Sequence, residues 1–386
     1  MNRLLAIRRR GLIATVAAAM LVALAAGPAS AAPPTVAFVP PSPAEGATLT
    51  STSVSFSFTY NRNPNATRTL VCTLSGPTSL SGPCDAPVAF GSKGSRSGRS
   101  YGGLQNGSYT FTVSLTLTDG GTASASRRFT VAVPARHVYW TNRSSGTIGR
   151  ADVDGQSVNQ SFITGADDPH GVAVDSGHIY WTNLNGADVN GGTIGRADLG
   201  GQNANQSFIT GAHFPEGVAV DAGHVYWANL GAGGTIGRAD VGGQSANQAL
   251  ITGAHFPVGV AVDSGHVYWA NDGTGTIGRA DLDGQNANQS FITGIDQAEG
   301  VAVDSGHVYW TTGSGIGRAD LNGQNANQSF ITGANGPTGV AVDSGHVYWV
   351  NNASGTIGRA DLNGQNVDQS FITGANGPWG VAVDPG

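Results

Sequence analysis

Three histidines and two glutamates are the side chains in this sequence best suited to move protons or bind a metal ion. His170, Glu216 and Glu299 each stand directly before a Gly-Val-Ala-Val segment, while His213 and His255 stand in two copies of Ala-His-Phe-Pro. A histidine beside a carboxylate can serve in acid–base catalysis or as part of a metal site. The sequence does not show that these side chains converge. We therefore favour solvated residues of a binding face, with a catalytic site as the alternative, and predict no metal site.

These segments belong to a repeat that fills most of the chain. The dipeptide Tyr-Trp occurs six times, and the histidine two residues before it stands at 137, 178, 224, 266, 307 and 346, so the period is 39 to 46 residues. Each copy has four short runs rich in β-branched and aromatic residues, separated by Gly, Asn and Asp. Such runs predict strands. Four strands in a repeat of this length predict one blade of a β-propeller.

Side-chain size predicts the place of each strand in its blade. The small residues of 171–175 suit the innermost strand, the Tyr-Trp segment the second, 148–152 the third and 161–164 the outermost. The repeats begin on a second strand at 137 and end on an innermost strand at 380–384. We therefore expect a six-bladed ring in residues 137–386, with the C-terminal strand completing the first blade.

One face of this propeller is predicted to bind a ligand. The loops between second and third strands, and those between one blade and the next, share a face and differ among the copies, whereas the turns of the opposite face hardly vary. Variable loops on a rigid scaffold are common binding sites. The predicted binding residues are His170, Glu216, Val258, Glu299, Thr338 and Trp379, which precede the innermost glycines, together with Phe214 and Phe256.

The repeats resemble the YWTD repeat, also called the low-density lipoprotein receptor class B repeat, which forms six-bladed propellers. The shared motifs are Tyr-Trp-Thr, Ile-x-Arg-Ala-Asp-x-Asp-Gly and Pro-x-Gly-Val-Ala-Val-Asp, over residues 137–384. The final Asp of the family motif is Asn in five copies here and Thr at 312. Similar Pro-x-Gly-Ile-Ala-Val-Asp and Ile-Gly-Arg segments occur in NHL-type and streptogramin-lyase-type propellers. The latter resemblance implies, as an alternative, an enzyme using His170, His213, His255, Glu216 and Glu299.

Residues 33–135 are predicted to form a separate β-sandwich. Alternating strands are expected at 53–60, 69–74, 87–90, 109–117 and 125–133, with a hairpin turn at Asp119-Gly120. Cys72 and Cys84 are the only cysteines, and a disulfide between them is expected in an exported protein. The segment resembles bacterial Ig-like modules, which implies a spacer or an adhesive role.

Residues 1–31 have the pattern of a secretion signal. Four arginines precede or begin an apolar stretch, and Ala29-Ser30-Ala31 predicts cleavage after Ala31. The formal net charge of −6 becomes about −10 when these arginines are removed, and no basic run is left. This composition disfavours nucleic acid and anionic membranes as partners. We expect a secreted monomer without a membrane span.

The repeated charged residues are interpreted as structural. This applies to the six repeat histidines and to the Arg and Asp of Ile-Gly-Arg-Ala-Asp, which we expect to form a ring of ion pairs. Asp152-Val-Asp154-Gly155 and Asp281-Leu-Asp283-Gly284 resemble the opening of a calcium loop, but the distal Glu is missing. A turn is the favoured interpretation, with Ca²⁺ as the alternative, and no other cofactor is expected.

These observations lead to three hypotheses of function. The first is a secreted, non-enzymatic protein that binds an extracellular protein or glycan through the variable face. The second is a propeller enzyme of the streptogramin-lyase type with His and Glu at the channel mouth. The third is a structural or adhesive protein of the cell wall.

Overall fold

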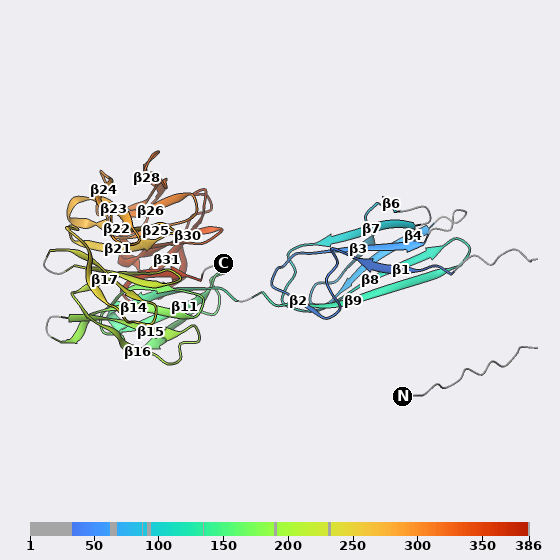
Figure 1. The fold of residues 1–386 in the computed structure, drawn as a ribbon, viewed down its shortest axis with the longest axis horizontal. Coiled ribbons are helices and arrows are strands. Elements are labelled where there is room, and N and C mark those ends of the chain that lie inside the picture. Colours follow the sequence, from blue (N-terminus) through green and yellow to red (C-terminus); the bar gives the residue numbers. More distant parts are fainter. Residues whose placement is uncertain are drawn as a thin grey trace, which may run out of the picture. The chain divides into compact units, whose positions relative to one another are not determined.

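The computed structural model describes residues 33–61, 68–86, 88–90, 94–133, 135–188, 191–230 and 233–384. The chain divides into two compact units, Met1–Pro134 and Ala135–Gly386, which we describe separately (Figure 1). The predicted signal at 1–31 and Pro87, the first residue of one predicted strand, lie outside the described residues. Among the described residues, no helix is long and apolar enough to cross a membrane.

The described residues of the first unit form two β-sheets. The four-stranded sheet has the order β1-β3-β7-β6, with β1 at Val36–Val39, β3 at Val54–Asn61, β7 at Gly94–Tyr101 and β6 at Val88–Phe90. The five-stranded sheet has the order β2-β9-β8-β4-β5, with β2 at Ala47–Leu49, β9 at Thr122–Val131, β8 at Gly107–Leu117, β4 at Arg68–Ser75 and β5 at Leu80–Pro83.

The two sheets pack face to face because their strands alternate apolar and polar side chains. In β8 every second residue from Tyr109 onward is buried, and this row contributes to a core shared by both sheets. Phe56 of β3 stacks on Phe111 of β8 with ring centroids 4.0 Å apart. The five predicted strands are confirmed to within a few residues, and so is the hairpin between β8 and β9. The strands β1, β2, β5 and β7 were not predicted, because they are short or, like β7, rich in Gly, Ser and Arg.

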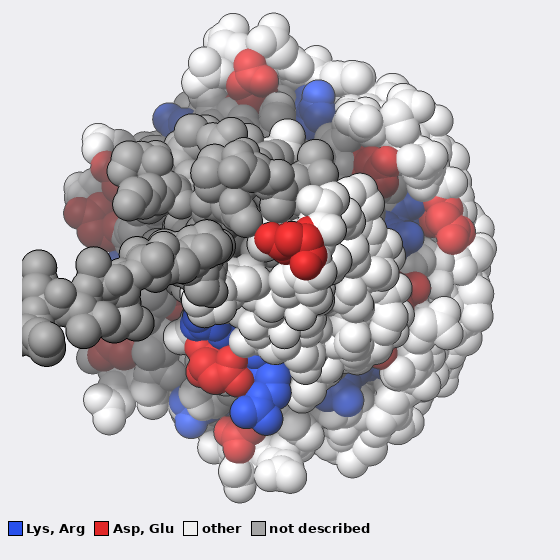
Figure 2. Space-filling model, turned by 90° about the vertical axis from the view of Figure 1, so that its right-hand side faces the viewer, with Lys and Arg blue, Asp and Glu red and all other residues white. Residues whose placement is uncertain are grey.

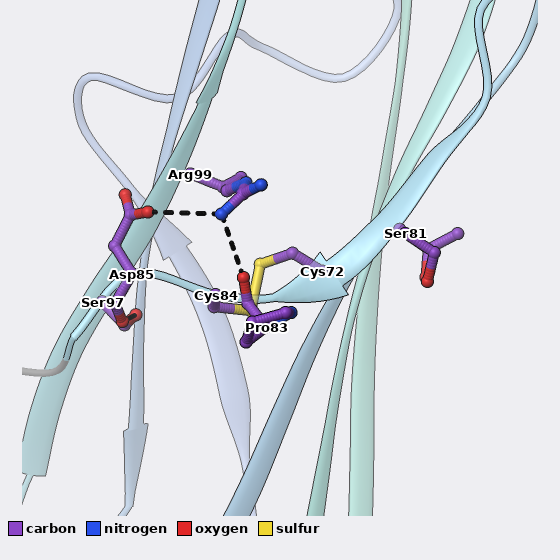
Figure 3. The surroundings of a disulfide bond; sticks show 8 residues. Cys72, Ser81, Pro83, Cys84, Asp85, Ser97 and Arg99 are labelled. Atoms are coloured by element: carbon purple, nitrogen blue, oxygen red, sulfur yellow. Dashed lines mark hydrogen bonds and ion pairs between the residues drawn. A yellow bond between two sulfur atoms is a disulfide. The ribbon is translucent and has the colours of Figure 1, made fainter.

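The predicted disulfide between Cys72 and Cys84 is present (Figure 3). Cys72 is a buried residue of β4, and Cys84 follows β5 at the point where the chain leaves the five-stranded sheet. The next residue, Asp85, pairs through its backbone with Gly98 of β7 in the other sheet. Arg99 donates a hydrogen bond to the carbonyl of Pro83 beside the disulfide. The covalent bond therefore fixes a crossing between the two sheets.

The described residues of the second unit form six four-stranded sheets. The first sheet has the order β12-β11-β10-β33, with β12 at Asn159–Thr164, β11 at Thr147–Asp152, β10 at His137–Asn142 and β33 at Pro378–Val383. The second is β13 (Pro169–Val174), β14 (His178–Asp188), β15 (Gly191–Asp198) and β16 (Asn205–Ala212); the third is β17 (Pro215–Val220), β18 (His224–Asn229), β19 (Thr235–Asp240) and β20 (Asn247–Thr252). The fourth is β21 (Pro257–Val262), β22 (His266–Asn271), β23 (Thr276–Asp281) and β24 (Asn288–Ile292). The fifth is β25 (Val301–Val303), β26 (His307–Thr312), β27 (Gly315–Asp320) and β28 (Asn327–Thr332); the sixth is β29 (Pro337–Val342), β30 (His346–Asn351), β31 (Thr356–Asp361) and β32 (Asp368–Thr373).

The strand order within these sheets is the predicted one. The C-terminal strand β33 pairs with β10, so the end of the chain completes the first sheet, as expected from the sequence. The Tyr-Trp strand follows the Gly-Val-Ala-Val strand in every sheet, and all six of its tryptophans are fully buried. Large aromatic rings therefore fill the space where neighbouring sheets diverge.

The Gly-Val-Ala-Val strands close into a ring around one axis. A Cβ atom on Gly171 of β13 would lie 2.6 Å from the carbonyl oxygen of Glu216 in the next sheet, and the same contact recurs from sheet to sheet. It ends at Gly380 of β33, where a Cβ would lie 2.5 Å from the carbonyl oxygen of His170. Neighbouring backbones thus approach so closely that only glycine fits. Four-stranded sheets arranged in a closed circle make this unit a β-propeller.

Among the described residues, the Arg and Asp of Ile-Gly-Arg-Ala-Asp do not form the expected ion pairs with each other. Arg196 lies over the ring of Phe208, with its Cζ atom 4.0 Å from the centroid, and donates a hydrogen bond to the carbonyl of Val241 in the next sheet. The Asp at the end of the same strand, Asp198, instead accepts a hydrogen bond from Asn203. An Arg held by an aromatic ring and a carbonyl needs no carboxylate partner.

The two sequences that resemble a calcium loop form turns. Asp154 and Asp283 each accept a hydrogen bond from the backbone N–H two residues later. Asn322 and Asn363 accept the same bond in other copies, so the turn does not depend on a charge.

Candidate functional site at the channel mouth

The six variable positions before the innermost glycines surround one end of the central channel. Five of them line a cavity of about 400 Å³, open solvent included, and His170 lies beside it. The cavity-lining side chains at these positions are Glu216, Val258, Glu299, Thr338 and Trp379. The structure thus brings together the residues that the repeat pattern predicted at the mouth.

His170 and Glu216 form a buried pair between neighbouring sheets. Nδ1 of His170 lies 2.5 Å from Oε2 of Glu216, and the two residues are only 3% and 5% exposed. Nε2 of His170 is buried without a hydrogen-bond partner, and the nearest carboxylate oxygen on that side is Oδ1 of Asp168 at 3.7 Å. The imidazole therefore lies between two carboxylates.

Trp379 is in contact with His170 and Arg143. The His170 ring lies 5.0 Å from it, and the guanidinium of Arg143 lies over it at 4.8 Å. Arg143 also forms a salt bridge with Asp168, with Nε 3.0 Å from Oδ1. These contacts join residues of the first and second sheets into one continuous group. The indole is consequently a fixed wall of the mouth.

Glu299 has a different environment from Glu216. Its Oε2 atom is buried and has no hydrogen-bond partner. Burial, together with the negative charges of Asp272 and Glu216, raises the pKa of Glu299 from 4.5 to about 7. At neutral pH this carboxyl group is therefore close to half protonated and can give up or take up a proton.

Comparison with known proteins identifies the family. The model of the Virginiamycin B lyase family matches residues 107–360, about two-thirds of the chain. This chain belongs to the virginiamycin B lyase family. The match runs from β8 to β31 and includes all the mouth residues except Trp379.

Solved structures add little to the family assignment. The chain is similar to the computationally designed Ika8 protein, with 14% identity and a TM-score of 0.35 over 82% of this chain and 97% of that one. It is also similar to apo AztD from Citrobacter koseri, with 12% identity and a TM-score of 0.35 over 82% and 98% of the two chains. No curated protein matches this chain. Similarities at this level add nothing about function to the family match.

The two other histidines singled out in the sequence do not join the mouth of this family member. His213 and His255 are exposed, and the structure places them three residues before Glu216 and Val258, where their backbone N–H groups donate to Asn229 and Asn271. Within the described ranges, no three His, Cys, Asp or Glu residues are arranged to hold a metal ion. Of the five candidate catalytic residues, only His170 and Glu216 are in contact.

Sequence reasoning missed Arg143, Asp168 and Asp272. Arg143 is the only basic residue in the loops between second and third strands, and this was a signal that could have been used. Its contacts with Asp168 and Trp379 depend on the closure of the first sheet by the C-terminal strand.

The Asn two residues after the Tyr-Trp dipeptide in five of the six copies positions the variable loops. In the second sheet, Nδ2 of Asn183 donates to the carbonyl of Gln206, while its Oδ1 accepts from the backbone N–H of Asp167. A carboxylate could accept the second bond but could not donate the first. The amide therefore links a strand to the loop that precedes the mouth residue His170.

Two phenylalanines are exposed on the same face. Phe214 is 46% exposed and Phe256 is 63% exposed, and both have a left-handed backbone, with φ of 49° and 50°. Glycine occupies the equivalent positions 336 and 377. Acidic residues outnumber basic ones on the loops of this face. Figure 2 views the molecule from the right-hand side of Figure 1, and the surface that it shows carries scattered charged side chains without a continuous basic patch.

Proposed function

We propose that this chain is a secreted, non-enzymatic binding protein that engages an extracellular protein or glycan through the variable face of its propeller. In this proposal the first unit is an Ig-like sandwich, and the second is a six-bladed propeller related to the YWTD repeat. The closed ring of innermost strands supports the blade count. The disulfide is compatible with an extracellular location.

The exposed phenylalanines carry the proposal. A bulky residue with positive φ costs about 1–3 kcal/mol of backbone strain, and an exposed ring recovers little of that by burial. The fold does not require a side chain there, because Gly336 and Gly377 occupy the same position in other copies. Strain without a benefit to folding is typical of functional sites.

The test replaces both rings by the residue that two other copies contain. The double variant Phe214→Gly/Phe256→Gly should be as stable as the parent or more so, but should lose binding on arrays of polysaccharides and of purified extracellular proteins. The matched control is Val158→Ala/Val367→Ala, which removes two valines of similar exposure from turns of the opposite face. Binding that survives the glycine variant, or is lost equally in the control, would show that the proposal is wrong.

A lyase activity is the second candidate function. It is supported by the family match and by Glu299, whose pKa of about 7 suits it to transfer a proton in an elimination. Incubation with virginiamycin B, followed by mass spectrometry, tests this candidate directly. Consumption by the parent that is lost in both Glu299→Gln and His170→Ala would support an enzyme. Consumption at the uncatalysed rate would exclude this substrate.

The third candidate, a structural or adhesive wall protein, predicts a different outcome. Retention on cell-wall material would then survive alanine substitutions of Glu299 and Trp379, and also the glycine substitutions at 214 and 256.

A further inference from the structure

Aliphatic side chains line the channel at and below the mouth. Each innermost strand contributes valines to its wall, and the cavity at the mouth is continued along the same strands by a second one of about 570 Å³, open solvent included. The valines that line both cavities are Val172, Val218, Val260, Val301, Val340 and Val381. Contact with these valine side chains favours the burial of aliphatic carbon, at about 0.8 kcal/mol for each methylene group.

The carboxylates at the rim fall into two classes. Asp168 is paired with Arg143, and Glu216 is paired with His170. Glu299 and Asp272, in contrast, form no ion pair with any Lys, Arg or His in the part of the chain that the structure describes. One side of the mouth therefore carries negative charge without compensation, directly above the valine-lined channel.

The geometry also limits the kind of cation that fits. No three ligating side chains converge on a metal position among the described residues. Arg143 already lies over the ring of Trp379, with its Cζ atom 4.8 Å from the centroid. What is left is the carboxyl group of Glu299, which lines the mouth cavity, forms no ion pair among the described residues, and can accept hydrogen bonds from N–H or O–H donors.

From these contacts we propose that the channel mouth binds a primary alkylammonium ion, with the ammonium group on Glu299 and the alkyl chain among the valines below. The ammonium group supplies a donor to the carboxylate of Glu299 and a charge opposite to those of Asp272 and Glu216. The alkyl chain leaves water as it enters the channel. This site is independent of any macromolecule bound by Phe214 and Phe256.

The proposal predicts a ligand series. We expect n-butylammonium to bind at pH 8 in isothermal titration calorimetry, with affinity rising about three- to fourfold for each methylene from propyl to pentyl. Butan-1-ol, which has no charge, and butyltrimethylammonium, which has no N–H donor, should bind at least tenfold more weakly. Equal binding of either compound, or displacement of n-butylammonium by Mg²⁺, would overturn the proposal.

Variants distinguish the mouth from the rest of the surface. Glu299→Gln should weaken n-butylammonium binding at least tenfold, whereas Asp283→Asn on an opposite-face turn, where other copies already have Asn, should leave it unchanged. Val301→Phe, which narrows the channel, should abolish the gain from each added methylene. Phe214 and Phe256 lie on exposed loops and not in the channel. The variant Phe214→Gly/Phe256→Gly should therefore bind n-butylammonium normally even if the proposed function fails.

The pH dependence gives a further check on the same site. The charged groups around Glu299 are Asp272 from the loop after β22 and Glu216 from β17, with His170 behind Glu216. A proton on Glu299 competes with the ammonium ion, so binding by the parent should weaken as the pH falls below about 7. Binding that is unaffected by Glu299→Gln, at any pH, would contradict the assignment.

Discussion

The repeated Gln of the outermost strand links neighbouring sheets through a single side chain. In the second sheet, Oε1 of Gln206 accepts a hydrogen bond from the indole N–H of Trp181, and its Nε2 donates to the carbonyl of Thr164 in the first sheet. The bond recurs around the ring and closes it, because Gln160 donates to the carbonyl of Thr373. The Gln therefore accepts the hydrogen bond of a buried indole N–H and links two neighbouring sheets.

Replacing this Gln should cost more than its exposure suggests. Gln206→Leu leaves the buried N–H of Trp181 without an acceptor, so we expect a loss of about 1–3 kcal/mol in the free energy of unfolding. The control is Gln202→Leu, an exposed turn residue four positions earlier, which should change stability by less than about 0.5 kcal/mol. Urea unfolding followed by tryptophan fluorescence compares the two variants. Equal losses of stability would show that the hydrogen bonds of Gln206 do not contribute as proposed.

Glu299 should make the folded state sensitive to pH. Its pKa is raised by burial from 4.5 to about 7, so the folded protein holds this proton more tightly than the unfolded chain. The resulting stabilisation is complete below about pH 4.5 and is lost as the pH rises through 7. Glu299→Gln, which stays neutral, should therefore exceed the parent in stability at pH 8 by on the order of 1 kcal/mol, after allowance for solvent screening.

Urea unfolding of parent and Glu299→Gln at pH 4 and pH 8 measures this difference. The gain should be confined to the higher pH. A gain of the same size at both values would mean that the carboxyl group is not held in its protonated form by the fold.

At the scale of elements, the closure of the propeller rests on residues at the two ends of the second unit. Arg136, just before β10, donates to the carbonyl of Asp384, just after β33, and forms an ion pair with Asp343 at 3.2 Å. Nδ1 of His137 lies 3.0 Å from Asp384. The first and last strands are thus held by side chains as well as by backbone pairing.

Removing Arg136 should weaken this closure. Asp343 is buried, with 4% of its side chain exposed, and Arg136→Met takes away its cation. The carboxylate keeps hydrogen bonds from the backbone N–H groups of Gly345 and His346. We therefore expect the free energy of unfolding to fall by about 2 kcal/mol, which is less than is usual when a buried ion pair loses one partner. A double-mutant cycle with Asp343→Asn, read by urea unfolding, should give a coupling energy well above zero. The exposed pair Arg128–Glu45 is the control and should give less than about 1 kcal/mol.

The sequence repeat made the strands of the propeller predictable. The contacts at the mouth and the strands of the first unit have no such repeat, and they were harder to predict. Six copies of one pattern fixed the strand order and placed His170 and Glu216 at equivalent positions on neighbouring strands. Their contact could not be predicted, because it depends on the distance between two backbones that only the glycine ring determines. The raised pKa of Glu299 likewise depends on burial. In the first unit, β7 had no apolar alternation, so nothing in its sequence indicated a strand.

At the scale of the whole molecule, the two units are stabilised in different ways. The second unit gains its stability from a ring of repeated aromatic cores, and it contains all seven tryptophans. The first has one core and the only disulfide, and its aromatic residues are Phe and Tyr alone. Tryptophan fluorescence therefore reports the second unit, whereas circular dichroism reports both.

This difference predicts that loss of the disulfide will affect one unit only. Cys72 and Cys84 close a loop of 12 residues, so Cys72→Ser/Cys84→Ser should destabilise the first unit by about 2–3 kcal/mol, mainly by freeing its unfolded chain. In urea, the circular dichroism curve should show an earlier transition in the variant, while the fluorescence midpoint stays within error of the parent. A fluorescence midpoint that moves with the disulfide would mean that the two units unfold together. That outcome would contradict the expectation that two units with separate cores unfold in separate transitions.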